Sequence, residues 1–175
     1  MTTYISYAFL LTALFSFASC SSTSEETTRG SEATATREEH AKEAKEETIV
    51  NVVNEYLSIK NALVASNAET AQAGAVKLLG VVDATEMPEV QQETKELAAV
   101  TNIDSLRTHF DLLSVALYEE IKQHPDSSRT LYKQYCPMAF NNQGAFWLST
   151  EKEIKNPYYG DKMMNCGRVE EELTF

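Results

Sequence analysis

Residues 101–121 read TNIDSLRTHFDLLSVALYEEI, and this stretch decides the fold because it carries a strong helical stripe. The apolar side chains recur at steps of three and four residues, at Leu106, Phe110, Leu113, Leu117 and Ile121, which places them on one helix face. Thr101-Asn102-Ile103-Asp104 reads as a capping box that starts the helix. The helix is expected to end before Pro125.

Three further helices are predicted upstream. Residues 37–66 have helical apolar spacing from Ile49 to Val64, and residues 71–82 form a second, alanine-rich segment. Pro88 starts a third segment that reaches Val100, since proline is tolerated in a first turn. Four helices with short connections predict a mainly α fold built as an antiparallel four-helix bundle.

The last fifty residues change character and predict a small C-terminal appendage. Residues 131–135 and 145–149 are aromatic and strand-like, and a turn signal separates them at 141–144, so a β-hairpin is expected. Asn156-Pro157 begins a short helix that ends at Cys166. Residues 168–173 are a candidate third strand.

Five sulfur-bearing residues lie in two short motifs of this appendage, Cys136-Pro137-Met138 and Met163-Met164-Asn165-Cys166. One thiolate and one thioether from each motif, at Cys136, Met138, Met163 and Cys166, form a ligand set that suits Cu(I). His109 lies on the stripe of the fourth helix, as a buried core histidine or as a further metal ligand. The two cysteines can instead form a plain disulfide. Under either hypothesis, we predict that Cys136 and Cys166 approach each other.

The start of the chain resembles a lipoprotein signal peptide. Residues 1–19 are mostly apolar and end in Ala18-Ser19, and Cys20 follows as the expected site of lipidation. Residues 20–36 have no large apolar side chain and are expected to be a flexible tether. Residues 37–175 are expected to form a single domain, held at the outer membrane of the cell envelope by the lipid anchor.

The charge and the motif content restrict the function. The chain has a formal net charge of −11, which repels phosphates, so nucleic acid and anionic lipid surfaces are excluded as partners. No CxxC redox motif, HExxH helix or nucleophile elbow occurs in the sequence. The chain is therefore not expected to be an enzyme.

Several segments together resemble a known family. Residues 56–64 (YLSIKNALV) are similar to the opening of domain of unknown function 3347. Residues 135–139 (YCPMA), 144–149 (GAFWLS) and 154–167 (IKNPYYGDKMMNCG) resemble its ending, so the likeness spans about residues 48–173. The resemblance implies a bacterial envelope lipoprotein that handles metal, with a heavy-metal efflux component as its partner. It implies the same four sulfur residues as ligands, with His109 as a further one.

Two functions are therefore expected. The first is a Cu(I)-binding envelope lipoprotein that buffers the metal or passes it to an efflux system. The second is a structural or protein-interaction domain without metal, in which a Cys136–Cys166 disulfide joins the hairpin to the following short helix.

Overall fold

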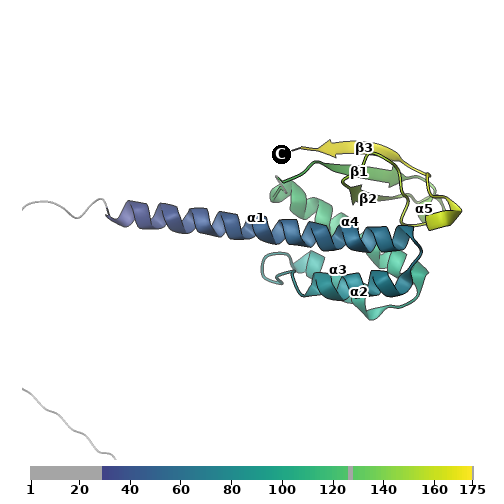
Figure 1. Ribbon diagram of the computed structural model, residues 1–175, viewed down its shortest axis with the longest axis horizontal. Helices are drawn as coiled ribbons and strands as arrows, with labels where there is room; N and C mark the ends of the chain where they lie inside the picture. The colour runs from purple at the N-terminus through teal and green to yellow at the C-terminus, as the bar shows by residue number, and fades with distance from the viewer. Residues whose placement is uncertain (1–28, 126–127, 175) are drawn as a thin grey trace, which may run out of the picture. The chain divides into compact units, whose positions relative to one another are not determined.

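Four long helices precede a small sheet in the computed structural model, which describes residues 29–125 and 128–174 (Figure 1). The long helices are α1 (Arg29–Val64), α2 (Ala68–Leu79), α3 (Pro88–Ala99) and α4 (Ile103–Gln123). The sheet contains β1 (Leu131–Cys136), β2 (Ala145–Ser149) and β3 (Arg168–Leu173), with short helical turns α5 (Ala139–Asn142) and η1 (Gly160–Lys162) between them. The predicted mainly α fold with a C-terminal hairpin is confirmed at this level.

The helix boundaries follow the capping residues of the sequence. The side chain of Asn67 accepts a hydrogen bond from the Thr70 amide at the start of α2. That of Asn102 accepts from the amides of Asp104 and Ser105 at the start of α4. Each cap satisfies backbone donors that a helix leaves without partners in its first turn.

The start of α1 corrects the expected extent of the tether. The helix begins at Arg29, so residues 29–36 are helical, whereas residues 20–28 lie outside the part of the chain that is described. The prediction placed the helix start where apolar periodicity becomes recognisable. Backbone hydrogen bonds need no apolar side chain, and the segment contains alanine and glutamate and lacks proline. Within the described residues, no helix is both long enough and apolar enough to cross a membrane.

The core forms on the predicted stripes. All five apolar residues of the α4 stripe are fully buried, and α1 contributes Tyr56, Ile59 and other buried side chains. Gly74 of α2 lies against α1, where a Cβ atom would be 2.8 Å from Cγ1 of Ile59. A side chain at this position would therefore force the two helices apart.

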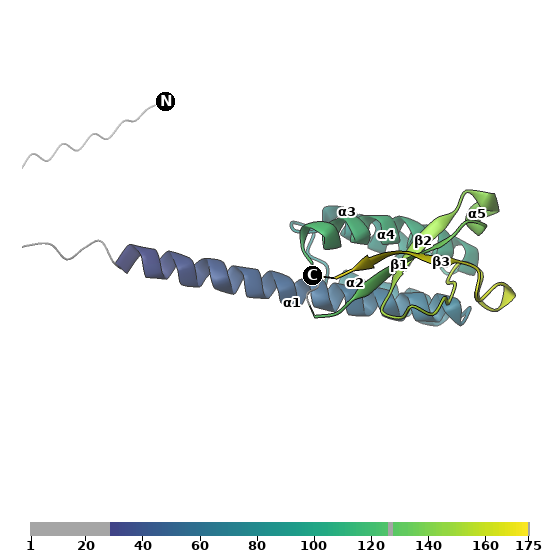
Figure 2. The same cartoon turned by 90° about the horizontal axis from the view of Figure 1, so that it is seen from above.

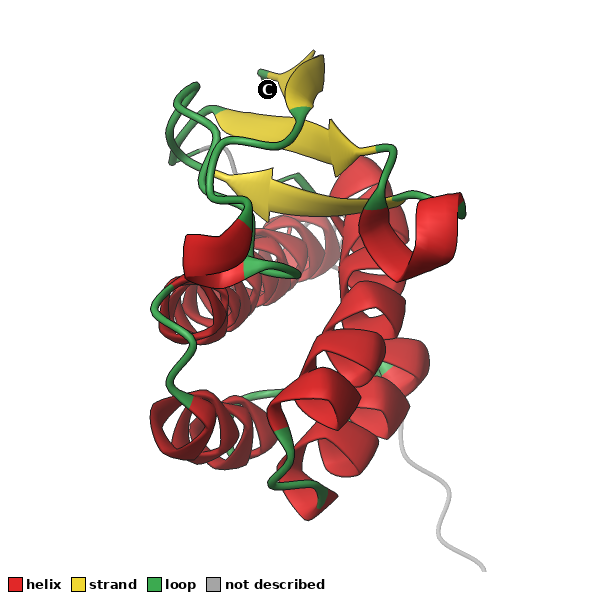
Figure 3. Ribbon diagram, turned by 90° about the vertical axis from the view of Figure 1, so that its right-hand side faces the viewer, coloured by secondary structure: helices red, strands yellow, loops and turns green. Residues whose placement is uncertain are grey.

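The sheet is antiparallel, in the order β2-β1-β3. Both the predicted hairpin and the predicted third strand are confirmed. Figure 2 shows the strands lying over the helical layer, and Figures 1 and 3 show β2 as the strand nearest to the helices. The amide of Leu148 in β2 donates to the Tyr56 hydroxyl of α1 at 3.0 Å, and the Tyr158 hydroxyl donates to the Phe146 carbonyl. Tyrosine side chains thus satisfy backbone groups of this outer strand.

The predicted short helix over residues 157–166 is wrong. Asn156 does cap the turn as expected, because its side chain accepts hydrogen bonds from the amides of Tyr158 and Tyr159. The chain then reaches Gly160 with φ +54, which ends any regular right-handed helix. A Cβ atom at Gly160 would be 2.3 Å from Oγ of Ser66. The chain at Gly160 therefore packs closely against the residues that follow α1 and does not continue as a helix. Only the 3₁₀ turn η1 remains.

Candidate functional site

The two cysteines meet at the end of the sheet. Cys136 is the last residue of β1 and is fully buried, and Cys166 is half-buried just before β3. Their Sγ atoms are 2.9 Å apart, longer than the ~2.05 Å of a disulfide bond, and both are free thiols. The predicted approach of Cys136 and Cys166 is confirmed.

Asn156 holds the segment that carries Cys166. This fully buried residue donates from its side-chain amide to the Cys166 carbonyl at 2.8 Å, and its backbone amide donates to the Met164 carbonyl. Together with the two amides that its Oδ1 accepts, Asn156 connects both ends of the loop. The position of Cys166 therefore depends on hydrogen bonds from one polar side chain.

Arg107 connects the same loop to the helices. From α4 it donates to the Pro157 carbonyl at 2.9 Å and to Oγ of Ser66 at 3.1 Å. The side chain is buried, and burial lowers its pKa because desolvation disfavours the charged form. Several oxygen partners compensate for that desolvation.

The backbone atoms of the two predicted methionine ligands, Met138 and Met163, form hydrogen bonds at the same end of the sheet as the cysteines. The Met138 backbone hydrogen-bonds the Cys166 thiol, and the Met138 carbonyl accepts from the Tyr159 hydroxyl at 2.6 Å. The Met163 carbonyl accepts from the Cys166 amide at 3.1 Å. Met138 is 43% exposed and Met163 is half-buried. Because residues 157–166 are not a continuous helix, Met163 and Cys166 do not share a helix face as predicted.

A left-handed turn follows Met138. Phe140, Asn141 and Asn142 all have positive φ, at 48, 59 and 68 degrees. The left-handed conformation disfavours side chains with a Cβ atom by about 1–2 kcal/mol per residue, and asparagine tolerates it best. The sequence signalled a turn at this point, but not its hand. This turn lies next to the Cys136-Pro137-Met138 motif, where it sets the path of the chain.

His109 is half-buried on α4, and its Nδ1 atom has no hydrogen-bond partner. Across residues 29–125 and 128–174, no three His, Cys, Asp or Glu side chains gather into a group that could hold a metal ion. A set of His109 with both cysteines would be such a group. His109 and the two cysteines therefore do not form one metal-holding group.

Contact with Cys136 affects the protonation of the Cys166 thiol. The hydrogen bond with Cys136, followed by burial, raises the pKa of Cys166 to about 11, while the Met138 backbone bond lowers it. The thiol of Cys166 is therefore protonated at neutral pH. A metal ion must displace this proton to gain a thiolate ligand.

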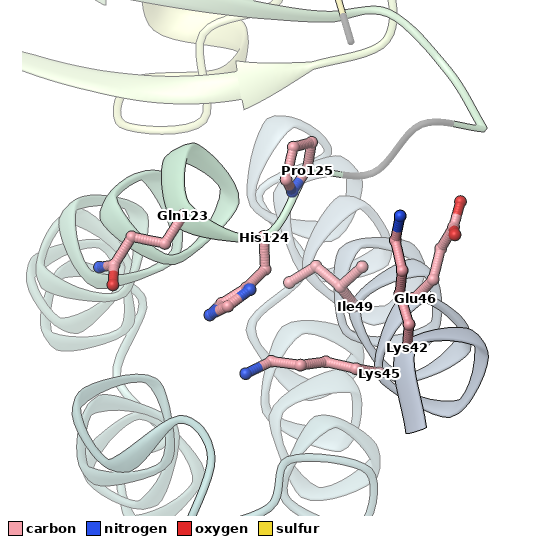
Figure 4. A pocket seen from close by; sticks show the side chains of 7 residues that line it. All are labelled: Lys42, Lys45, Glu46, Ile49, Gln123, His124 and Pro125. Atoms are coloured by element: carbon pink, nitrogen blue, oxygen red, sulfur yellow. The ribbon is translucent and has the colours of Figure 1, made fainter. Parts of the chain in front are cut away.

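A pocket that the sequence did not indicate lies between α1 and the end of α4. Figure 4 shows its lining side chains, which include Lys45, Ile49 and His124, around a volume of about 390 Å³. Lys45 pairs with Glu86 at 2.9 Å, and His124 lies 3.8 Å from Glu120. Acidic neighbours thus balance two of the basic groups of the pocket lining.

The fold and the site define a mainly helical domain with a thiol pair at the end of its sheet. Residues 52–129 match the family described as Protein of unknown function (DUF3347), so this helical part of the chain belongs to that family. No curated protein matches the chain, and no solved structure matches it. The matched region ends before β1, so it covers helices and leaves the cysteine motifs outside. The resemblance expected up to residue 173 is thus supported over its helical part.

Proposed function

We propose that this chain is a cell-envelope lipoprotein whose reduced thiol pair binds Cu(I), for metal buffering or for transfer to a heavy-metal efflux component. The supporting observation is the 2.9 Å separation of the Cys136 and Cys166 sulfurs. Cys136 and Cys166 supply thiolates, and Met138 and Met163 supply thioethers. Soft sulfur ligands of this kind select Cu(I) over harder divalent ions.

Binding requires a local rearrangement. The two sulfurs must move apart to bind an ion between them. The present 2.9 Å separation is too short to hold a metal ion bonded to both sulfur atoms. Cys136 is held in the central strand, whereas Cys166 follows a single 3₁₀ turn in an irregular loop. Movement of the Cys166 loop is therefore the route that disturbs the fewest backbone hydrogen bonds.

The test is competition for Cu(I) against a chromophoric chelator, performed anaerobically on the reduced full chain. Cys136→Ser and Cys166→Ser are expected to abolish most of the binding. Met138→Leu and Met163→Leu are expected to weaken it with little change in fold, since leucine roughly conserves volume. Met164→Leu is the comparison variant, because Met164 is not among the proposed ligands, and it should leave the affinity unchanged. Failure of the wild-type chain to hold Cu(I) against a weak chelator rejects this proposal.

The proton on Cys166 adds a second readout. The pKa of the Cys166 thiol is raised to about 11. The fraction of thiolate at Cys166 therefore increases steadily as the pH rises from neutral to about 11. The apparent affinity of the wild-type chain for Cu(I) should therefore rise with pH up to about 11. An affinity that is independent of pH contradicts thiolate coordination at Cys166.

A disulfide-stapled domain is the second candidate function, favoured by the direct contact of the two thiols without an intervening group. In this case, the chain acts as a structural or protein-interaction domain and holds no metal. A free-thiol count on protein purified from its native membrane without reductant separates the two. Two free thiols favour the metal site, and none favours the staple.

Lipidation at Cys20 completes the proposal, although Cys20 lies outside the described residues. It is supported by the apolar leader that ends in Ala18-Ser19. Intact mass of the native protein should show a chain that begins at Cys20 and carries acyl groups. Cys20→Ala should leave the chain unprocessed or release it from the membrane fraction, and a mature start elsewhere without lipid contradicts the anchor.

A further inference from the structure

Helix α4 carries a second apolar stripe beside the buried one. Leu112 and Val115 are 46% and 45% exposed, and Ala116 is half-buried next to them. These residues recur at three- and four-residue spacing, so they share a helix face. Two large aliphatic side chains one turn apart at this level of exposure form a local apolar surface on the solvent side of α4.

This stripe lies in a groove between α3 and α4. The groove has a volume of about 480 Å³, and its apolar part consists of Val90 from α3 with Leu112, Val115 and Ala116 from α4. Val90 is buried and forms the floor. The site therefore combines an apolar centre with walls from two helices, which is the form of groove that accepts an amphipathic helix.

The rim of the groove is acidic. Glu89 and Glu93 line it from α3, Glu119 and Glu120 line it from α4, and no lysine or arginine is among the lining residues. Glu120 lies near His124 and Glu119 interacts electrostatically with Lys122, whereas no ion pair of Glu89 or Glu93 is found within the described part of the chain. Unpaired carboxylates around an apolar centre favour a partner with cationic side chains beside aliphatic ones.

We propose that the α3–α4 groove binds a basic amphipathic helix of a partner protein. The aliphatic face of that helix packs on Leu112 and Val115, and its lysine or arginine side chains pair with the rim glutamates. A second copy of this chain does not fit, because a formal net charge of −11 makes two copies repel. The groove and the thiol pair consist of different residues, so this proposal is independent of metal binding.

The probe is a fluorescent synthetic helix with leucine at positions i, i+3, i+4 and i+7 and lysine on the other positions, titrated with the full chain. Leu112→Ser combined with Val115→Ser should weaken binding by about tenfold, as expected for central contacts. Glu93→Gln combined with Glu119→Gln should weaken it by about fivefold and reduce its salt dependence. The charge variant keeps the test valid if the apolar variant fails to fold.

Matched controls separate the groove from the acidic surface in general. Val76→Ser replaces another exposed aliphatic residue, which is 58% exposed on α2, and Glu47→Gln with Glu69→Gln removes two exposed charges elsewhere. Both controls should retain the wild-type affinity, and a peptide with glutamate in place of lysine should not bind. The absence of saturable binding, or equal weakening by groove and control variants, overturns the proposal.

Discussion

The helical region and the C-terminal region are stabilised by different kinds of contact. In α1 to α4, buried aliphatic and aromatic stripes face one another, and the α4 stripe is fully buried. In the region from β1 to β3, side chains hydrogen-bond backbone atoms. Asn156 bonds the Cys166 carbonyl, and Gln134 donates to the carbonyls of Glu151 and Glu153.

This difference sets how each region responds to substitution. Apolar burial is non-directional and depends on area and volume, so a residue of similar size can replace another. A buried hydrogen bond depends on one atom in one place, and its loss leaves the partner group unsatisfied. The thiol pair lies in the second kind of environment, which is why its geometry depends on a few polar side chains.

The largest loss is expected from the centre of the helical region. The ring of Phe110 stacks on Tyr56 with centroids 4.9 Å apart and lies 6.1 Å from Tyr158. Phe110→Ala should destabilise the fold by about 3–5 kcal/mol through lost burial and the remaining cavity. Urea denaturation of reduced protein measures this, with Phe110→Leu as the milder control. A loss below about 1.5 kcal/mol would contradict the central role of this ring.

Oxidation of the thiol pair is the next largest effect, in the opposite direction. A Cys136–Cys166 disulfide closes a loop of 30 residues and should stabilise the chain by about 3–4 kcal/mol in the chain-entropy model. Urea denaturation with and without reductant measures the difference. The Cys136→Ser, Cys166→Ser double variant should show no response to reductant. Equal unfolding midpoints for oxidised and reduced wild-type protein would contradict the staple.

The helical part of the fold was predictable because its signal repeats. Five apolar side chains recur at three- and four-residue steps in α4, and Asn102 caps this helix where the pattern begins. The hairpin was also predictable, because two aromatic segments flank a turn-rich one. The early start of α1 was missed because residues 29–36 form a helix without an apolar stripe.

The candidate site was predictable only in outline. The two sulfur motifs predicted that Cys136 and Cys166 approach each other, and the structure confirms it. The loop around Gly160 was missed because its path depends on Arg107 and Ser66, which are distant in sequence. No local pattern records such a contact, and the helix predicted for residues 157–166 was based on the local signals at its two ends, Asn156-Pro157 and Gly167.

An intermediate loss of stability is expected at Asn156, which anchors a loop, and a smaller one at Asn67, which caps a helix. Asn156→Ala removes hydrogen bonds to the Cys166 carbonyl and to two amides, and should destabilise the reduced chain by about 2–3 kcal/mol because these groups are left unpaired. Asn67→Ala removes only an exposed cap and should cost about 1 kcal/mol. Thermal unfolding measures both.

The same pair of variants has a site-specific readout. Because Asn156 positions the loop of Cys166, Asn156→Ala should slow disulfide formation between Cys136 and Cys166, whereas Asn67→Ala should leave its rate unchanged. Oxidation is followed by the disappearance of free thiols after removal of reductant. Equal oxidation rates in the two variants would show that Asn156 contributes to stability without positioning the thiol.

The smallest expected effect is that glycine and alanine variants rank in opposite order of stability in the two regions. Asn51 is exposed in α1 and Asn141 is exposed in the left-handed turn after Met138. At Asn51, glycine should be less stable than alanine by about 1 kcal/mol, because a right-handed helix favours alanine. At Asn141, where φ is 59, glycine should be more stable than alanine by about 1 kcal/mol, because the Cβ atom disfavours this conformation. Melting temperatures of the four single variants under reducing conditions measure both differences. Since neither side chain is buried, packing does not obscure the comparison. The same ranking at both positions would mean that the turn is right-handed in solution and that the path of the chain beside Met138 is different.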